Sequence, residues 1–193
     1  METMSGSAKK QSQQGAQDGG DTPAVCRECG RSVSQEHSLR IDDGVVCTDC
    51  LYGDARPFRI YPVGTVVAHN VRHFPQHHQG QDEPSDLSEI RILSGMQRFM
   101  YRLEEESYLT VIWYLDQQGV IKTRFARGWD GKIVGPFASR TPNRPTPIAV
   151  TDVQLVQIVD STLYVRGLDA ASGTPVLDIK AAKKTLPAQD KND

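Results

Sequence analysis

Apolar and polar positions alternate with a short period over most of the chain after residue 60. Stretches rich in β-branched and aromatic residues are separated by clusters of Gly, Pro, Asp and Gln. This pattern is typical of short strands joined by turns. The stretches that we expect to form strands are residues 62–68, 88–93, 108–115, 120–126, 148–159, 163–166 and 176–180. Residues 108–115 are nearly all apolar or β-branched, so we expect this strand to be the most buried.

One stretch has the spacing of a helix. Met96, Phe99, Met100 and Leu103 recur every three or four residues, which predicts one short amphipathic helix. Many short strands with one helix and tight turns predict a mainly β fold, an antiparallel barrel or sandwich. The sequence has no Gly-rich strand-to-helix turn of the dinucleotide-binding type.

The four cysteines form two Cys-x-x-Cys pairs with seventeen residues between them. This spacing is typical of a tetrahedral zinc site. The ligands would be Cys26, Cys29, Cys47 and Cys50. Four thiolates leave no open coordination position, so the zinc would be structural, and it would supply about 10 kcal/mol of folding free energy to a module too small for a core. The alternatives are a pair of redox dithiols or free structural cysteines.

Composition divides the chain further. Residues 1–24 have almost no large apolar side chains and are expected to be a disordered tail. We expect a zinc-ribbon-like module at residues 25–55, a β domain at residues 60–182 and a solvated tail at residues 183–193. No apolar run is long enough to span a membrane and the polar N-terminus lacks a signal region, so we expect a cytoplasmic protein without a membrane partner.

Residues 135–148 contain four prolines, three of them (Pro142, Pro145 and Pro147) within six residues, and two arginines, Arg140 and Arg144. Proline restricts its own φ and the residue before it, so we expect a stiff, extended loop. An arginine on such a loop suits a phosphate or carboxylate, because little entropy is lost on binding. The alternative is a surface connector whose arginines have no role.

Charge is uneven along the chain, although the net charge is only −2 and the pI about 6.2. Between residues 122 and 144 one acid, Asp130, is accompanied by six basic residues: Lys122, Arg124, Arg127, Lys132, Arg140 and Arg144. This is a positive patch that suits RNA, or else an ordinary solvated face. Trp129 would stack on a base or simply plug the loop. The histidines of residues 69–78 fit no regular face, so we expect a solvated loop there rather than a metal site.

Two stretches resemble a known family. FASRTPNRPTPI at residues 137–148 and GLDAASGTPVLDIK at residues 167–180 are similar to two motifs of the TsaA-like proteins. That family includes the S-adenosylmethionine-dependent methyltransferase of N6-threonylcarbamoyladenosine in tRNA. The resemblance covers roughly residues 61–180 and not the cysteines. It implies a small antiparallel β-barrel that forms a homodimer, with S-adenosylmethionine near the dimer interface and tRNA or another RNA as partner.

The resemblance also implies site residues. Those expected at the cofactor are Pro75, Gln76, Leu115, Asp116, Arg140, Val150, Ser172, Gly173, Thr174 and Pro175. Those expected at the acceptor are Asn143, Arg144, Asp178 and Lys180. The chain differs from the family's usual residues at Asn143, Thr146, Ala149 and Ser172, where the family has His, Asn, Gly and Asp.

Two classes of function therefore stand. The first is a methyltransferase that modifies an adenosine of tRNA, or a different acceptor. Methyl transfer from a sulfonium depends chiefly on alignment, so the sequence identifies no catalytic residue. The second is a non-catalytic protein that binds S-adenosylmethionine or a partner through the barrel and the zinc module.

Overall fold

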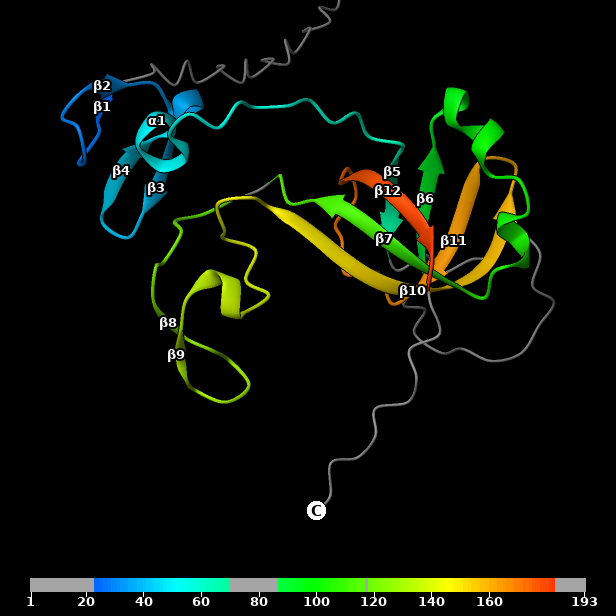
Figure 1. The fold of residues 1–193 in the computed structure, drawn as a ribbon. Coiled ribbons are helices and arrows are strands. Elements are labelled where there is room, and N and C mark those ends of the chain that lie inside the picture. Colours follow the sequence, from blue (N-terminus) through cyan, green and yellow to red (C-terminus); the bar gives the residue numbers. More distant parts are fainter. Residues whose placement is uncertain (1–22, 70–86, 117, 183–193) are drawn as a thin grey trace, which may run out of the picture.

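The computed structural model describes residues 23–69, 87–116 and 118–182. Its largest element is a closed six-stranded barrel in which every neighbouring pair of strands is antiparallel (Figure 1). Around the barrel the order is β10-β11-β6-β5-β12-β7. The strands are β5 (Gly64–His69), β6 (Leu87–Ile92), β7 (Tyr108–Tyr114), β10 (Ile148–Val159), β11 (Thr162–Arg166) and β12 (Pro175–Ala181). The prediction of a mainly β, small antiparallel barrel is confirmed.

The barrel core is built from alternate residues of each strand. In β7, Leu109, Val111 and Trp113 are buried, while Tyr108 and Tyr114 are exposed. This strand is therefore not buried on both faces, because one face of every barrel strand points outward. The residues that fill the interior are Val66, Ile90, Ile92, Leu109, Val111, Trp113, Val153, Leu163, Val165, Leu168, Ala170 and Val176.

The predicted amphipathic helix has a different form. Two 3-10 helices, η2 (Ser94–Phe99) and η3 (Leu103–Glu105), stand in its place. Arg102 between them has a φ of 61°, and this left-handed residue interrupts any regular helix. Met96, Met100 and Leu103 still pack against the core, whereas Phe99 is 74% exposed.

The cysteine-containing segment has two hairpins and a short helix. Strand β1 (Ala24–Val25) pairs with β2 (Ser32–Val33), and β3 (Ser38–Ile41) pairs with β4 (Gly44–Cys47). The 3-10 helix η1 (Gln35–His37) precedes β3, and α1 (Thr48–Tyr52) follows β4. The turn between β3 and β4 has Asp42 at a φ of 51°. We call residues 23–55 the cysteine module.

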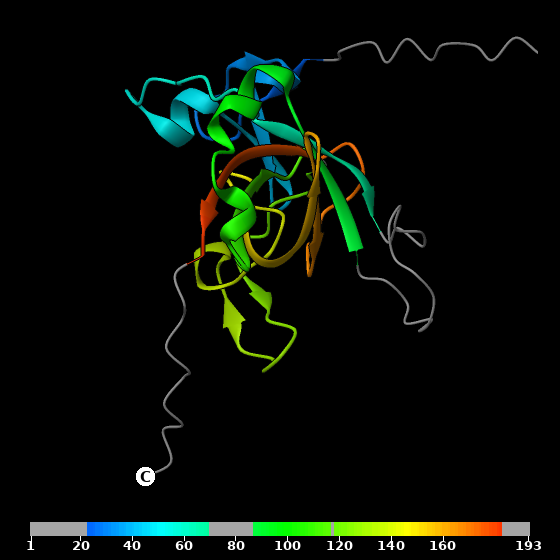
Figure 2. The same cartoon turned by 90° about the vertical axis from the view of Figure 1, so that its right-hand side faces the viewer.

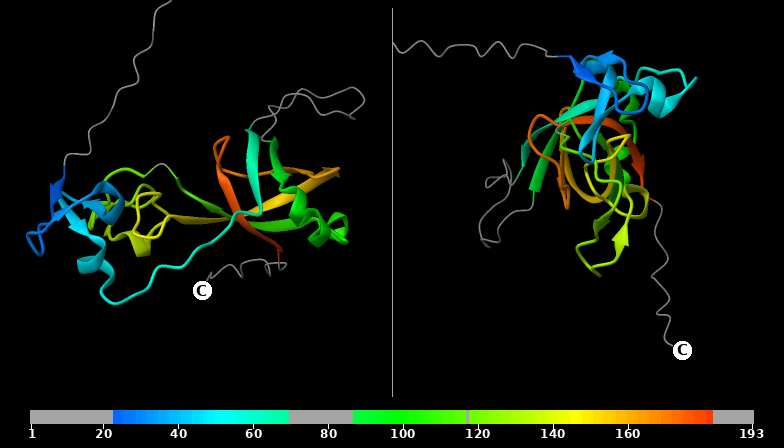
Figure 3. Two further views of the ribbon diagram at one scale, coloured as in Figure 1. Left: turned by 90° about the horizontal axis from the view of Figure 1, so that it is seen from above. Right: turned by 90° about the vertical axis from the view of Figure 1, so that its left-hand side faces the viewer.

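The chain between β7 and β10 leaves the barrel and lies beside the cysteine module (Figures 1 and 3). We call residues 118–146 the connecting segment. It holds β8 (Phe125–Ala126), β9 (Ile133–Val134) and the 3-10 helix η4 (Pro136–Ala138). The strand predicted at residues 120–126 is therefore reduced to Phe125–Ala126 and to a single bridge between Ile121 and Ile41. The barrel is already closed without it.

The two ends of the molecule differ. Turned by 90°, the structure shows η2 and η3 nearest the viewer, and the cysteine module and connecting segment extend behind the barrel (Figure 2).

Among the described residues no helix has the length and apolar character needed to cross a membrane. Residues 1–22 of the tail predicted at residues 1–24, the tail predicted at residues 183–193, and the His-rich loop beyond residue 69 with Pro75 and Gln76 lie outside the described residues. Ala24, at the end of the first predicted tail, belongs to β1.

Candidate functional site

A cavity of about 790 Å³ lies beside the first half of β10. We call it the β10 cavity. Four residues that the sequence proposed for a site line it together: Leu115, Arg140, Arg144 and Val150. The remaining lining residues are Trp113, Thr141, Pro142, Thr146, Ile148, Ala149, Thr151, Asp152 and Asp169. The structure thus brings the Arg-bearing loop to the edge of a strand.

Within the part of the chain that the structure describes, the first half of β10 pairs with a strand on one edge only. Pairing with β11 begins only at Gln154, whereas pairing with β7 begins at Ile148. Leu115 N donates to Pro147 O at 2.8 Å and Leu155 N donates to Ser107 O at 3.0 Å, so odd-numbered residues of β10 bond to β7. Backbone groups of an antiparallel strand alternate in direction, so the N–H and C=O of Val150 point away from β7. The cavity therefore borders a backbone donor and acceptor.

The walls of the β10 cavity carry opposite charges. Arg140 and Arg144 stand on the loop side. Asp152 accepts a hydrogen bond from Thr110 Oγ1 at 2.6 Å, and Asp169 comes from the turn after β11. Two further lining residues are bonded to each other, since Trp113 donates from Nε1 to Thr151 Oγ1 at 3.2 Å. The cavity can accordingly hold a ligand that has an anionic group, a cationic group and an apolar part.

The sequence did not single out Trp113, Thr151, Asp152 or Asp169. Asp169 lies in the second family-like motif, which was the one available signal for it. The other three lie in strands that looked like ordinary core. They line the cavity because one edge of β10 pairs with no described strand there. The alternation of residues within a strand does not reveal which of its edges is paired.

The other proposed cofactor residues lie elsewhere. Gly173 N donates to Val66 O at 2.7 Å, Ser172 Oγ donates to Val67 O at 2.9 Å, and Thr174 is buried. These contacts fasten the turn before β12 to β5. Residues 172–175 and Asp116 are not among the residues that line the β10 cavity. The contact of Ser172, Gly173, Thr174, Pro175 and Asp116 with a cofactor stays a prediction.

The proposed acceptor residues are divided. Arg144 lines the cavity, whereas Asn143 Oδ1 accepts from Gly119 N at 2.8 Å and braces the loop. Gln118 Nε2 donates a further hydrogen bond to Arg144 O at 2.8 Å. Asp178 and Lys180 form an ion pair with each other on β12. Their role at an acceptor also stays a prediction.

The positive patch is partly neutralised from within. Arg127 donates to Asp130 and to Ala138 O, and its guanidinium lies 4.3 Å from the centre of the Trp129 ring. This pairing lowers the pKa of Asp130, chiefly through the hydrogen bond from Arg127. Arg127 therefore shapes the loop between β8 and β9. Trp129 remains 69% exposed, so it does not plug the loop.

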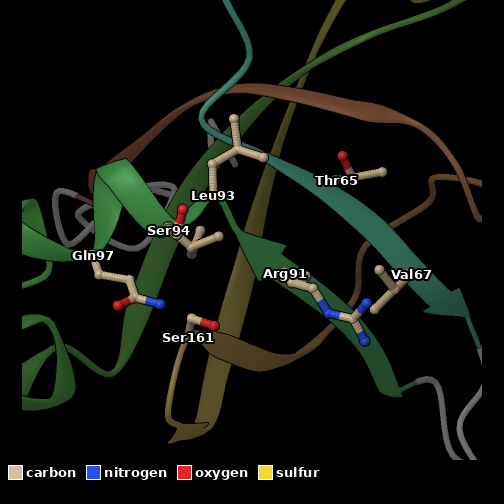
Figure 4. Close-up of a pocket in the computed structure, with 8 residues that line it drawn as sticks. Thr65, Val67, Arg91, Leu93, Ser94, Gln97 and Ser161 are labelled. Carbon is tan, nitrogen blue, oxygen red and sulfur yellow. The ribbon is translucent and has the colours of Figure 1, made fainter.

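A second hollow of about 390 Å³ lies on the outer side of β5 and β6 (Figure 4). Gln97 of η2 and Ser161 border it on one side, and Thr65 and Val67 of β5 on the other, with Arg91 between them. None of the residues proposed for the cofactor or acceptor lines it.

The four cysteines converge on one point. Their Sγ atoms all lie within 4.8 Å of one another, with 4.0 Å between Cys26 and Cys50 and 3.9 Å between Cys29 and Cys47. Zinc–sulfur bonds of about 2.3 Å in a tetrahedron imply sulfur–sulfur distances of about 3.8 Å. The cluster therefore has the size of a tetrahedral thiolate site.

Local donors favour the thiolate form of Cys26 and Cys29. Cys47 N donates to Cys26 Sγ at 3.3 Å, and such backbone donors lower the pKa of Cys26 to about 6. Arg31 Nε donates to Cys29 Sγ at 3.4 Å and lowers the pKa of that thiol. The neighbouring sulfurs, Cys47 first, raise the pKa of Cys50 to about 12. A bound cation would offset the electrostatic repulsion between neighbouring thiolates.

Comparison with known proteins identifies the relatives of the barrel. The model of the tRNA-methyltransferase O N-terminal domain matches residues 68–186. The chain is 34% identical over 122 residues to a probable S-adenosyl-L-methionine-binding protein of Methanothermobacter thermautotrophicus, covering 63% of this chain and 88% of that protein. It is 29% identical over 93 residues to the human tRNA (adenine(37)-N6)-methyltransferase, covering 47% of this chain and 21% of that protein.

A solved structure has the same fold. TrmO from Pseudomonas aeruginosa superposes with a TM-score of 0.52 at 23% identity, covering 72% of this chain and 61% of that one. The chain thus spans less than two thirds of this structure and about a fifth of the human relative. The family model nevertheless matches more than half of the chain, and the archaeal relative is matched over most of its length. The chain belongs to the family of the tRNA-methyltransferase O N-terminal domain.

Proposed function

We propose that this protein is an S-adenosylmethionine-dependent methyltransferase that acts on an adenosine of tRNA. The observation that carries the proposal is the β10 cavity, in a chain whose family and human relative are named for tRNA methylation. S-adenosylmethionine has a carboxylate, an ammonium group, a sulfonium and an adenosine. The cavity offers a matching group for each of these parts except the sulfonium.

The residues that would hold the cofactor follow from this chemistry. Arg140 suits the carboxylate, because a guanidinium binds it with two parallel hydrogen bonds. Asp169 suits the ammonium group or a ribose hydroxyl. The backbone of Val150 suits the edge of the adenine, and Leu115 and Ile148 supply apolar contact. The volume of about 790 Å³ is within the usual range of roughly 300–1,000 Å³ for small-molecule sites.

The bound cofactor would supply an activated methyl group. The chain's own contribution is to orient the two reactants and to exclude water, since alignment accounts for much of the rate of such transfers. Arg144 and Thr146 border the same cavity and would hold the acceptor. No general base is assigned.

The test is methyl transfer itself. Purified protein is incubated with methyl-labelled S-adenosylmethionine and total tRNA, and binding of the cofactor is measured by calorimetry. We expect label in the tRNA, and nuclease digestion should place it on an adenosine. Binding without label in any RNA, protein or metabolite would support the second function, a protein that binds S-adenosylmethionine without methyl transfer. The archaeal relative is named as a probable S-adenosyl-L-methionine-binding protein. Label in protein or metabolites alone would keep a methyltransferase but overturn the tRNA acceptor.

We also infer that the cysteine cluster holds one structural zinc ion. The convergence of four sulfurs at tetrahedral spacing supports this, and no fifth ligand is needed. A structural ion would act through folding and take no direct part in the methyl transfer.

We further propose that RNA binds across the exposed basic residues of the connecting segment. Lys122 and Arg124 are exposed, whereas Arg127 is held by Asp130. Replacing both Lys122 and Arg124 with glutamine should lower the salt dependence of tRNA affinity by roughly 0.7 to 0.9 for each phosphate that is no longer bound. Arg98→Gln on η2 is the matched control and should leave the slope unchanged. An unchanged slope in the double variant would exclude this surface, and cofactor affinity should not move in either protein.

Finally, we propose a homodimer that uses the outer face of β7 and β10. Tyr108 and Tyr114 of β7 and Val150 of β10 are exposed apolar side chains on this face. Tyr108→Glu should convert the dimer to a monomer in sedimentation experiments, because a charge would be buried at the interface. A wild-type protein that sediments as a monomer at tens of micromolar would contradict this.

A further inference from the structure

Ile121 belongs to the core of the cysteine module, although it lies in the connecting segment. Its side chain is 3% exposed and packs with Cys26, Ile41, Val46 and Cys47. Its backbone joins the same module, since Ile121 N donates to Arg40 O at 2.9 Å and Asp42 N donates to Ile121 O at 2.8 Å. Two metal-ligating candidates therefore share a core with a residue from a distant part of the chain.

Two side chains strengthen this junction. The carboxylate of Asp42 accepts from Thr123 N at 2.9 Å and from Thr123 Oγ1 at 2.6 Å, and these bonds lower the pKa of Asp42. Near the other end of the connecting segment, the Tyr52 hydroxyl donates to Pro145 O at 2.9 Å. The cysteine module thus holds the segment at both its beginning and its end.

The segment transmits this support to the β10 cavity. Gln118 and Gly119 lie directly before the Ile121 junction and bond to the loop at Pro142, Asn143 and Arg144. Within the described residues, the hydrogen bonds that link residues 118–145 to other parts of the chain go to the cysteine module. The barrel bonds to this loop at its last residues, where Leu115 N donates to Pro147 O at 2.8 Å, and the module supports the part before Pro147, which presents Arg140 and Arg144.

We propose that the cysteine module is a clamp that positions this loop, so that metal binding by the four cysteines orders one wall of the β10 cavity. Ile121 is the main positioning residue. The module acts at a distance, because none of the four cysteines lines the cavity. The identity of the cavity's ligand rests on the function proposed above, whereas the ordering of the loop does not.

The physical basis is the coupling of metal binding to folding. A small module without its metal loses most of its folding free energy. The side chain of Ile121 then no longer packs against the apolar core of the module, and Asp42 and Tyr52 lose their fixed positions. The prolines keep the loop locally extended, but its position relative to the barrel is then no longer fixed, and fixing that position when an anion binds costs affinity. Metal removal should therefore weaken ligand binding without any contact between metal and ligand.

The test compares two isoleucines of the same segment. Ile121→Ala removes the buried contact, while Ile133→Ala changes a side chain that is 68% exposed. Hydrogen exchange is followed by mass spectrometry in both variants and in wild-type protein with and without a zinc chelator. We expect exchange of the amides in residues 135–147 to accelerate on the order of tenfold or more in Ile121→Ala and in the metal-free protein. Exchange in β6 and β11 should not change, and Ile133→Ala should behave as wild type.

A second pair of variants tests a single hydrogen bond, and it keeps the proposal testable if Ile121→Ala misfolds. Tyr52→Phe removes the bond to Pro145, and Tyr101→Phe changes an exposed tyrosine of the barrel end. Tyr52→Phe should keep its zinc and accelerate exchange near Pro145, whereas Tyr101→Phe should not. Loop exchange that is unaltered in metal-free wild-type protein would overturn the clamp.

Cofactor affinity separates the clamp from the proposed function. S-adenosylmethionine should bind Ile121→Ala and metal-free protein several-fold more weakly than wild type, with Ile133→Ala unaffected. If wild-type protein does not bind S-adenosylmethionine at all, the proposed function fails, and the exchange data still decide whether the clamp exists.

Discussion

Cys50→Ser should abolish stoichiometric zinc binding and unfold the cysteine module while the barrel remains folded. Removing one thiolate from a four-sulfur site leaves the ion with three sulfur ligands, and structural zinc contributes on the order of 10 kcal/mol to the folding of such modules. The barrel has its own core of twelve buried residues, so its strands should persist. Metal analysis of the purified protein and hydrogen exchange of residues 25–55 measure the two effects.

A variant at the same position provides the control. Cys50→His retains a nitrogen that can bind zinc, and Cys50 is exposed enough to accept a larger side chain. It should therefore recover much of the zinc content that Cys50→Ser loses. Wild-type protein that contains no zinc, or that carries a Cys26–Cys29 disulfide in reducing buffer, would contradict the site.

Arg140→Ala should weaken S-adenosylmethionine binding by about 1–3 kcal/mol, or roughly 5- to 150-fold in the dissociation constant. Arg140 lines the β10 cavity, and among its lining residues only Arg144 carries the same charge. A charge-assisted bond to the carboxylate would be lost and not replaced by water with equal strength. Calorimetry, or quenching of Trp113 fluorescence, gives the affinity.

Two substitutions make this result specific. Arg140→Lys keeps the charge but not the planar fork, so it should recover part of the affinity. Arg124→Ala removes an arginine of the same segment that does not line the cavity, and it should leave the affinity unchanged. No heat with wild-type protein at millimolar cofactor would count decisively against the cofactor site.

The barrel strands show how accurately hydrophobic periodicity predicts the positions of strands. The stretch at residues 148–159 coincides with β10 at both ends, and the barrel strands on either side of it in the chain were placed within about two residues. Alternation is a local property, because each strand must present one face to a core. The 3-10 helices at residues 94–105 differ from the predicted helix because spacing alone does not reveal that Arg102 adopts a left-handed conformation.

The candidate site was predicted only in part. Local motifs identified Arg140, Val150 and Leu115, and the structure brings them to one cavity. Asp169 and Asp152 join them because β11 pairs with β10 only from Gln154 onward. That register is a long-range property, and no local pattern contains it. The likeness of residues 172–175 to a motif likewise did not reveal that their hydrogen bonds go to β5.

By itself, the sequence determined the features that depend on neighbours in the chain. The spacing of cysteines, the periods of strands and the restricted φ of the loop's prolines are set by residues within a few positions of one another. The tertiary structure alone decided which segments meet. Ile121 had the pattern of a strand residue, but its partner is the cysteine module and not the barrel. Burial of an apolar side chain requires only a complementary surface, and the choice among distant surfaces is made when the whole chain folds.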